Sequence, residues 1–307
     1  MTGATPQADV VVPSYNAGSL LSRAVRSALA LACVARVIVV DDGSAAPEVL
    51  EADLLPAVGA GRVMMLRQEN GGPSAARNRA LREVTAAYAV FLDADDALLP
   101  GIADAIRFAH ERHAAAVVSG RVDVAPNGGR AEKRPPRELA GTLIGQAAEV
   151  WRPIALFGMP GVVLARSVIA AGVRFDADIR CGEDRQFLHR VLAAGEFADG
   201  RKGLGVCDAL VVAYTISVDG TSLSGAKNLP RMVSDYGRLT GMYCDARSHG
   251  YFAAQWRWFA AQAARHGAPH ECWENIVRVC AERAISVPVK VRLRRWWRGA
   301  KREASGK

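Results

Sequence analysis

The chain has 307 residues, of which 50% are hydrophobic, so it can bury a full core in one large domain with a C-terminal extension. Residues 1–9 lack the charged and apolar regions of a signal peptide, and no apolar run reaches the roughly 18 residues of a membrane span, so we expect a cytoplasmic protein. The 6 cysteines are scattered without a CxxC pair, which argues against a disulfide framework and a zinc knuckle.

The formal net charge of +8 is concentrated at the C-terminus, where residues 287–307 hold eight Lys or Arg against one Glu. A basic surface over the whole chain would suggest a nucleic-acid partner, which we do not expect here. Here the basic residues are interleaved with apolar ones, including Trp296 and Trp297. This pattern instead favours peripheral contact with the anionic inner face of the cell membrane. The alternative is a solvated tail whose tryptophans fold back onto the core.

Apolar runs alternate with helical patterns in the first part of the chain. We predict strands at residues 10–12, 37–40, 62–66, 87–92 and 115–119. Apolar positions at helical spacing predict helices at residues 20–29, 47–58, 75–84 and 100–113. This alternation is typical of an α/β protein with a parallel sheet and right-handed crossovers. Such sheets bind ligands beyond the carboxyl ends of their strands, where each polar cluster lies.

The second part of the chain begins with a change in composition. Residues 126–140 are rich in Pro, Gly, Lys and Arg and predict a mobile surface loop. We then expect a strand at 161–165, a helix at 182–194 with an acidic first turn, and an edge strand at 206–214. Residues 229–280 are predicted to be largely helical, with interruptions at Gly267 and Pro269.

Three carboxylates, Asp93, Asp95 and Asp96, end the predicted strand at residues 87–92. Carboxylates packed at a strand tip repel one another unless a cation or a donor-rich ligand compensates for their charge. Asp93 and Asp95 share a face if the strand persists, which suits a hard divalent ion bridged to phosphate oxygens. The other interpretation is a helix N-cap at Asp95 or Asp96.

Five ordered segments together resemble the family 2 glycosyltransferases of the GT-A fold. They are Val10-Val-Val-Pro-Ser-Tyr-Asn16, Val39-Val-Asp-Asp-Gly-Ser44, Asn70-Gly-Gly-Pro-Ser-Ala-Ala-Arg-Asn78, Phe91-Leu-Asp-Ala-Asp-Asp96 and Gly182-Glu-Asp184. The resemblance implies a mostly parallel central sheet flanked by helices, with a helical C-terminal extension. We expect a GT-A domain at residues 8–225, with a nucleotide-binding half at about 8–120 and an acceptor-binding half at about 121–225. A helical region at 226–286 and the basic tail at 287–307 would follow.

The resemblance also implies an activity. Such enzymes transfer a sugar from a nucleotide diphosphate donor, usually a UDP-sugar, with inversion at the anomeric carbon and with a divalent metal, Mg²⁺ or Mn²⁺. The acceptor would be a saccharide or a lipid-linked hydroxyl used in polysaccharide, lipopolysaccharide or other glycoconjugate synthesis.

The predicted donor site combines side chains from four of the segments. Pro13, Tyr15 and Asn16 would shape the nucleoside pocket, where Tyr15 either stacks on a base or packs internally. Carboxylates at Asp41 and Asp42 can accept hydrogen bonds from a base or a ribose, and the resemblance assigns the uracil contact to Asp41. The other interpretation of residues 42–44 is an ordinary turn and helix cap.

The diphosphate end of the donor site is predicted around two further segments. Arg77 follows Gly71-Gly72, so its guanidinium could reach the diphosphate, whereas Arg79 and Arg82 are expected at solvated helix positions. By resemblance, Asp93-Ala94-Asp95 is the DxD element, in which Asp95 chiefly holds the metal and Asp93 contacts the ribose or the metal.

Asp184 is the predicted general base, because a sugar hydroxyl is a poor nucleophile and must lose its proton to a carboxylate. Glu183 is predicted to position the acceptor. Many relatives carry a metal-proximal histidine that residues 214–224 lack, so Asp219, Ser222 or water would have to replace it. His189 is expected to be a packed or surface residue and not a ligand.

Three other functions fit the residues less well. A non-catalytic sugar-nucleotide-binding subunit would keep the fold, although Asp93, Asp95 and Asp184 argue against lost catalysis. A nucleotidyltransferase usually has a Gly-rich, basic loop after the first strand, where this chain has Pro13-Ser-Tyr-Asn16. No GxGxxG opens the first helix, which argues against a dinucleotide dehydrogenase.

Overall fold

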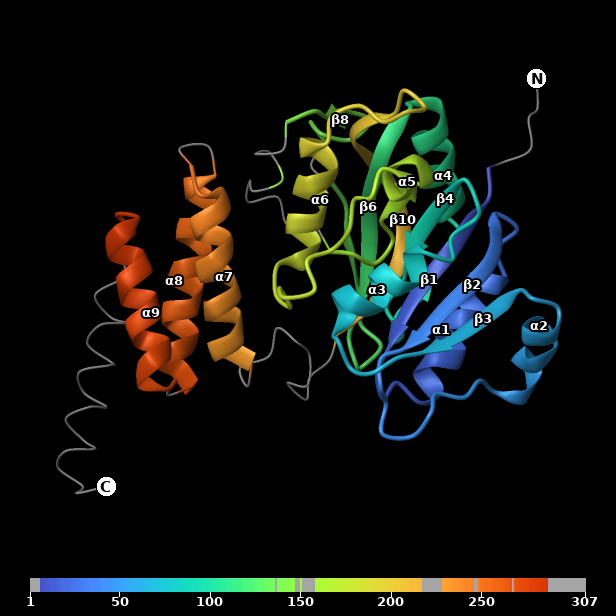
Figure 1. The fold of residues 1–307 in the computed structure, drawn as a ribbon, viewed down its shortest axis with the longest axis horizontal. Coiled ribbons are helices and arrows are strands. Elements are labelled where there is room, and N and C mark those ends of the chain that lie inside the picture. The colour runs from blue at the N-terminus through green and yellow to red at the C-terminus, as the bar shows by residue number, and fades with distance from the viewer. Residues whose placement is uncertain are drawn as a thin grey trace. The chain divides into compact units, whose positions relative to one another are not determined.

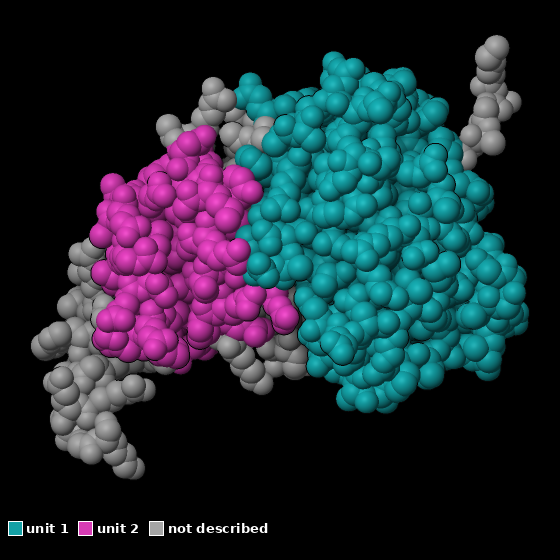
Figure 2. Space-filling view, in the orientation of Figure 1, with its two compact units in different colours: residues 1–150, 154–179, 183–217 teal, residues 151–153, 180–182, 218–307 magenta. Residues whose placement is uncertain are grey.

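The computed structural model describes residues 6–135, 137–146, 150, 158–216, 228–245, 248–266 and 268–286. The chain divides into two compact units, which Figure 2 shows in teal and magenta. The first unit comprises Met1–Val150, Ile154–Ile179 and Glu183–Ser217. The second comprises Trp151–Pro153, Arg180–Gly182 and Val218–Lys307.

A twisted sheet forms the centre of the first unit (Figure 1). Its main path has the order β3-β2-β1-β4-β9-β6-β10-β5, with β7 paired to β6 and β8 paired to β10. The first four strands, which are mutually parallel, are β1 (Ala8–Ser14), β2 (Val34–Asp41), β3 (Val63–Arg67) and β4 (Tyr88–Phe91). Residues 10–12, 37–40 and 88–91 are buried, as expected where helices cover both faces of a parallel sheet, whereas only Val63 is buried in β3 at the end of the sheet.

The second half of the sheet is mixed. β9 (Val163–Ala165) lies antiparallel between β4 and β6 (Ala114–Val124). β10 (Lys202–Thr215) runs parallel to β6. Its other side pairs antiparallel with β5 (Ala97–Leu98) and β8 (Leu143–Ile144), so the predicted edge strand is longer than expected and its edge is partly covered.

Helices α1 (Ser19–Leu29), α3 (Pro73–Leu81), α4 (Ile102–Glu111) and α6 (Glu183–Ala193) lie where the apolar spacing predicts them. The short helix α5 (Arg166–Ala170) was not predicted. In α1 the buried positions include Leu21, Ala24, Val25 and Ala28, which lie on one face of the helix. These apolar faces pack on the sheet and complete one core.

Two expectations for this unit are wrong. The helix predicted at 47–58 is reduced to a 3-10 turn, η1 (Ala52–Leu54), and to α2 (Leu55–Gly59). Backbone N–H groups before it are bound by side chains instead, since Glu48 N donates to Asp41 Oδ2 and Glu51 N donates to Ser22 Oγ.

The surface loop predicted at 126–140 contains a strand. β7 (Arg130–Lys133) pairs antiparallel with the end of β6. The turn that joins β6 and β7 is closed by Gly128, which has a φ of 81°, and Gly128 N donates to Ala125 O. Glycine in this region therefore forms the turn of a hairpin. The local composition does not reveal that β7 pairs with β6.

The second unit is helical, as predicted, and contains α7 (Leu229–Tyr243), α8 (His249–His266) and α9 (His270–Glu282). Its core is aromatic and includes Tyr236, Tyr251, Trp256 and Phe259. The hydroxyls of Tyr236 and Tyr251 are 2.8 Å apart, and Trp256 Nε1 donates to Thr240 Oγ1 at 2.9 Å. The polar atoms of these large side chains are thereby satisfied inside the core.

Several predictions concern residues outside the described ranges. The basic tail at 287–307, the interruption at Gly267 and the substitutes Asp219 and Ser222 all lie there. Within the described ranges, every helix is too short or too polar to span a bilayer.

Candidate active site

Arg77 is the centre of a charged cluster in the first unit. It lies on the buried face of α3, and its Nη2 donates to Asp93 Oδ1 at 2.9 Å, just beyond the carboxyl end of β4. Its Nη1 donates to Glu183 Oε1 at 3.2 Å, in the first turn of α6. The structure therefore brings together three predicted site residues, although Glu183 is 106 positions from Arg77 in the sequence.

The electrostatics of the cluster keep Arg77 charged. Its side chain is only 4% exposed, and this burial acts to lower its pKa. The charges and hydrogen bonds of Asp93 and Glu183 act in the opposite direction, so that the pKa of Arg77 is raised above its ordinary value. Its Nε makes no hydrogen bond with any described residue. A buried guanidinium of this kind depends on both carboxylates, because removal of either would leave one of its N–H groups without an acceptor.

A cluster of three phenylalanine rings packs beside the charged cluster around Arg77. Phe175 and Phe187 stack with ring centroids 4.0 Å apart, and both meet Phe91 edge to face. The guanidinium carbon of Arg77 lies 5.6 Å from the centroid of the Phe175 ring. These rings join β4, α6 and the segment before α6 into one support, so they fix where Glu183 and Asp184 lie.

Asn78 holds the same segment and was not predicted as a site residue. Its Nδ2 donates to Phe175 O at 3.0 Å, and its Oδ1 accepts from Phe175 N at 2.9 Å. Ser74 Oγ donates to Ile179 O at 3.3 Å. Asn78 directly follows Arg77 in the segment at residues 70–78, and this position was the only feature of the sequence that could have marked it as a site residue. Its partner at Phe175 is a long-range contact that periodicity does not reveal.

The three strand-tip carboxylates have different surroundings. Asp93 is partly buried, with a side chain 30% exposed, whereas Asp95 is exposed and Ala94 between them is buried. Although part of Asp95 reaches solvent, the protein around its carboxyl group partly desolvates it, and this desolvation together with the charge of Asp93 raises its pKa. Asp93 Oδ1 is occupied by Arg77, which leaves Oδ2 for another partner.

Asp96 does not cap a helix, so that interpretation is wrong. It is fully buried, and its Oδ1 accepts from Thr215 N in β10 at 2.8 Å, while Oδ2 has no partner among the described residues. Burial, followed by the charge of Asp93, raises the pKa of Asp96 to about 8. Asp96 cannot cap a helix because the chain continues into β5 after it, and α4 begins only at Ile102.

The end of β10 fixes the acidic loop. Thr215 Oγ1 donates to Asp95 O at 2.6 Å, and Arg23 of α1 donates to the same carbonyl and to Thr215 Oγ1. The neighbouring Tyr214 stacks under Arg121, whose guanidinium carbon is 4.4 Å from the ring centroid. These contacts were not predicted, because they depend on how β10 and β6 align.

Tyr15 and Asn16 lie in the turn after β1. The Tyr15 ring is 57% exposed and does not pack into the core, so the internal-packing interpretation is wrong, while Pro13 is partly buried within β1. Asn16 has a φ of 52° and joins this turn to the one after β2, since its N donates to Ser44 Oγ and its Oδ1 accepts from Ala45 N. The turn therefore presents an aromatic face on a fixed backbone.

Asp41 is buried at the end of β2 and is already bonded within the protein. Its Oδ1 accepts from Ser44 N at 2.9 Å, and its Oδ2 accepts from Glu48 N and from Arg67 Nη1. Burial acts to raise the pKa of Asp41, but these hydrogen bonds and the Arg67 charge outweigh it, so the pKa is lowered and the carboxylate is ionised.

Asp42 braces the turn that precedes α3. Its Oδ1 accepts from Gln68 Nε2 and Gly71 N, and its Oδ2 accepts from Gly72 N at 2.7 Å. Gly72 has a φ of 87°, which a side chain would oppose. Asp42 thus shapes the backbone that leads to Arg77. Residues 42–44 form a turn, but no helix follows directly, so they do not act as a helix cap.

Glu183 and Asp184 form the acidic first turn of α6, as predicted. Burial, followed by the charge of Asp184, raises the pKa of Glu183 to about 7. Burial also raises the pKa of Asp184, whose Oδ1 accepts from Arg185 N at 2.7 Å. Carboxyl groups with pKa values raised toward neutrality are suited to accepting a proton.

The described residues contain no group of three or more His, Cys, Asp or Glu side chains arranged to hold a metal ion. His189, in α6, therefore belongs to no such group among them. Any ion at the strand tip would have to take further ligands from a bound molecule or from water.

Comparison with known proteins gives consistent matches. The sequence model of the family described as Glycosyl transferase family 2 matches residues 9–181. The succinoglycan biosynthesis protein ExoU of Rhizobium meliloti (strain 1021) is 32% identical over 245 residues, which cover 74% of this chain and 66% of that protein. ExoO of the same organism, also named for succinoglycan biosynthesis, is 31% identical over 62% of this chain and 57% of its own length. The matched part is thus two thirds or less of either relative.

The fold also matches a solved structure. The crystal structure of S. aureus TarS 1-349 in complex with UDP-GlcNAc covers 93% of this chain and 82% of that chain, with a TM-score of 0.53 and 16% sequence identity. At this identity the likeness concerns the fold alone, and it confirms the predicted α/β fold class with C-terminal helices.

Proposed function

The chain belongs to glycosyl transferase family 2, and we propose that it is an inverting glycosyltransferase that moves a sugar from a UDP-sugar to an acceptor hydroxyl. The names of ExoU and ExoO support an acceptor used in polysaccharide synthesis. The crystal structure of TarS in complex with UDP-GlcNAc supports a uridine donor.

The observation that carries the proposal is the position of Arg77 between Asp93 and Glu183. One buried cation links the strand-tip carboxylate of Asp93 to the carboxylate of Glu183 in α6. Leaving-group chemistry needs positive charge beside the diphosphate, and acceptor activation needs a carboxylate on the other side of the reacting carbon. The cluster has both kinds of group, held by a rigid aromatic support.

The donor would be bound by the ends of β1, β2 and β4. The exposed Tyr15 would stack on the base, and Pro13 and Asn16 would shape its pocket. Asp41 would contact the uracil with its remaining acceptor capacity, while Asp42 keeps the Gly71-Gly72 turn in place.

The diphosphate would lie by Arg77 and the acidic loop. Asp95 and Oδ2 of Asp93 are the oxygens that would hold Mg²⁺ or Mn²⁺. Hard divalent ions are commonly held by one or two carboxylates together with substrate phosphates. When bound, the ion would supply charge stabilisation for the departing diphosphate.

Asp184 would act as the general base. Its carboxylate takes the proton of the acceptor hydroxyl as that oxygen forms a bond to the anomeric carbon, and the bond from this carbon to the diphosphate oxygen breaks with its electron pair leaving on UDP. Glu183, which is held by Arg77, would position the acceptor. Attack from the side opposite the leaving group inverts the configuration.

A panel of nucleotide sugars tests the donor class. The full chain is incubated with UDP-, GDP- and dTDP-sugars, with and without Mg²⁺ or Mn²⁺, and thermal stabilisation and nucleotide release are measured. We expect stabilisation and metal-dependent release with a UDP-sugar. Activity with GDP- or dTDP-sugars alone would overturn the donor assignment, and binding without hydrolysis or transfer would favour a non-catalytic subunit.

A further inference from the structure

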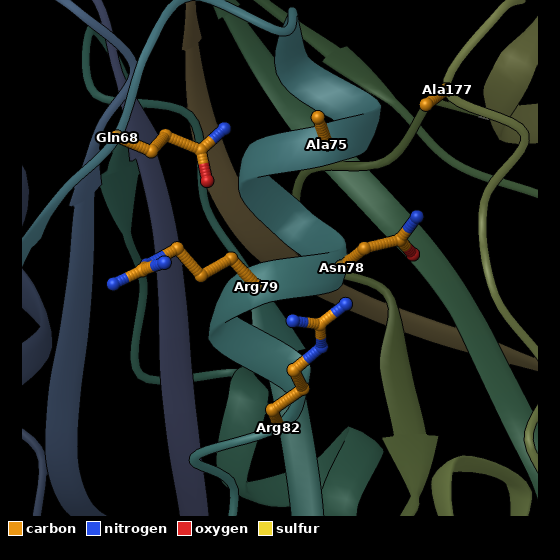
Figure 3. A pocket seen from close by; sticks show the side chains of 6 residues that line it. All are labelled: Gln68, Ala75, Asn78, Arg79, Arg82 and Ala177. Atoms are coloured by element: carbon orange, nitrogen blue, oxygen red, sulfur yellow. The ribbon is translucent and has the colours of Figure 1, made fainter.

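An open pocket of about 290 Å³ lies along the outward face of α3. Four of its lining residues, Ala75, Asn78, Arg79 and Arg82, recur at helical spacing and lie on one side of the helix. Figure 3 shows them between Gln68 on one side and Ala177 on the other. The proposed donor and acceptor residues do not line this pocket, so it is a separate feature of α3.

The pocket has a surplus of positive charge. Arg79 and Arg82 line it, and neither guanidinium is paired with a carboxylate in the part of the chain that the structure describes. The Nε of Arg79 is shielded from solvent and has no hydrogen-bond partner there. A buried donor without a partner costs free energy.

A third cation increases this charge. Burial lowers the pKa of Arg174, and the nearby charge of Arg82 lowers it further. The guanidinium of Arg174 donates to the carbonyl oxygens of Ile169 and Val173, and it forms no ion pair with a carboxylate among the described residues.

Two amides at the edge of the pocket have fixed orientations. Asn78 Nδ2 donates to Phe175 O, and Gln68 Nε2 donates to Asp42 Oδ1. An amide nitrogen carries two N–H groups, so each retains one that an incoming acceptor can use. These two amides are therefore donors whose positions are set before any ligand binds.

We propose that this pocket is an anion site that binds the phosphate group of a ligand about the size of a sugar phosphate. Guanidinium groups match phosphate oxygens in a bidentate geometry, which favours phosphate over a neutral sugar. The volume is close to the lower end, roughly 300 Å³, of small-molecule pockets and leaves room for more than a bare phosphate. The site rests on residues outside the proposed sugar-transfer machinery, so the two proposals can fail separately.

Calorimetric titration of the full chain with α-D-glucose 1-phosphate and with inorganic phosphate, at fixed ionic strength, tests the site. The variant is Arg79→Gln/Arg82→Gln, and the control is Arg107→Gln/Arg278→Gln, which removes two exposed arginine charges elsewhere. We expect the pocket variant to bind glucose 1-phosphate at least about tenfold more weakly than wild type, and the control to stay within about twofold. Equal affinity in the pocket variant, or the same loss in the control, would overturn the proposal.

A measurement on the unaltered protein avoids any effect of substitution on folding. Phenylglyoxal modifies accessible arginines, and peptide mass spectrometry reports which ones react. Glucose 1-phosphate should slow modification of Arg79 and Arg82 but not of Arg107, and a lack of protection at both pocket arginines contradicts the proposal. Tighter binding of the sugar phosphate than of inorganic phosphate would assign the ligand as a phosphorylated saccharide. Equal affinities would assign it as phosphate itself.

Discussion

At the residue scale, Arg77 is the side chain on which the proposed site depends. It is the shared partner of Asp93 and Glu183, and its guanidinium also contacts the Phe175 ring. A planar fork can serve two carboxylates at once, whereas a lysine ammonium is a single point charge on a flexible stem. Charge alone is therefore insufficient at this position.

The first prediction follows from this geometry. Arg77→Lys keeps the charge but loses the fork in which Nη1 and Nη2 each serve one carboxylate, so we expect a loss of about 1–3 kcal/mol in the free energy of unfolding. Urea denaturation measures it. Arg278→Lys is the matched control, because Arg278 pairs with Glu282 at an exposed position and should change stability by less than about 0.5 kcal/mol. Equal effects of the two substitutions would show that the buried pairing has no special weight.

The raised pKa values in α6 predict a pH dependence of activity. The pKa of Glu183 is about 7 and that of Asp184 is raised, and a general base must be deprotonated to act. Because the pKa of Asp184 is raised, we expect kcat/KM to fall on the acid side at a higher pH than the titration of an ordinary aspartate would give. Glu183→Gln removes a neighbouring negative charge, so the acid limb should move to lower pH. An acid limb that stays in place in this variant would contradict the coupling of the two groups.

At the element scale, the helices and strands that hold the site differ in how well the sequence predicts them. Strands β1 to β4 follow from apolar runs, and because parallel strands end at one edge, the convergence of Asp41 and Asp93 there was predictable. The support from Asn78 and Phe175 was not, because it joins α3 to a segment 97 positions away. The predicted helix at 47–58 failed since side chains of Asp41 and Ser22 bind its backbone.

At the start of α6, we predict that the residue before the helix, Gly182, cannot be replaced by alanine without a loss of stability. Gly182 has a φ of 84°, and an added Cβ would lie 2.7 Å from Leu239 Cδ1 within the second unit. Gly182→Ala should therefore destabilise the protein by more than Gly195→Ala, where φ is 77° but an added Cβ meets nothing within 4 Å. We expect the excess to be about 1–3 kcal/mol, as overpacking commonly costs. Equal thermal midpoints for the two variants would refute the steric part of the argument.

At the scale of the whole molecule, the predicted class of fold is confirmed, and the basic tail supplies the remaining prediction. Residues 287–307 carry most of the net charge, together with Trp296 and Trp297, and we propose that they hold the enzyme at an anionic membrane surface near a lipid-linked acceptor. Deleting them should abolish sedimentation with vesicles containing anionic lipid at low salt, and raising the salt should release the full chain. Unchanged sedimentation after the deletion would exclude this role.

Sugar transfer by the full chain is the most direct test of the proposed reaction. With the UDP-sugar that the panel selects, UDP release and the anomeric configuration of the product are measured for wild type and for Asp184→Asn. We predict an inverted product from wild type and a loss of about 10²–10⁴-fold in kcat for Asp184→Asn, with UDP affinity retained. Near-normal transfer by Asp184→Asn, or a product with retained configuration, would contradict the assignment of Asp184 as the base of an inverting reaction.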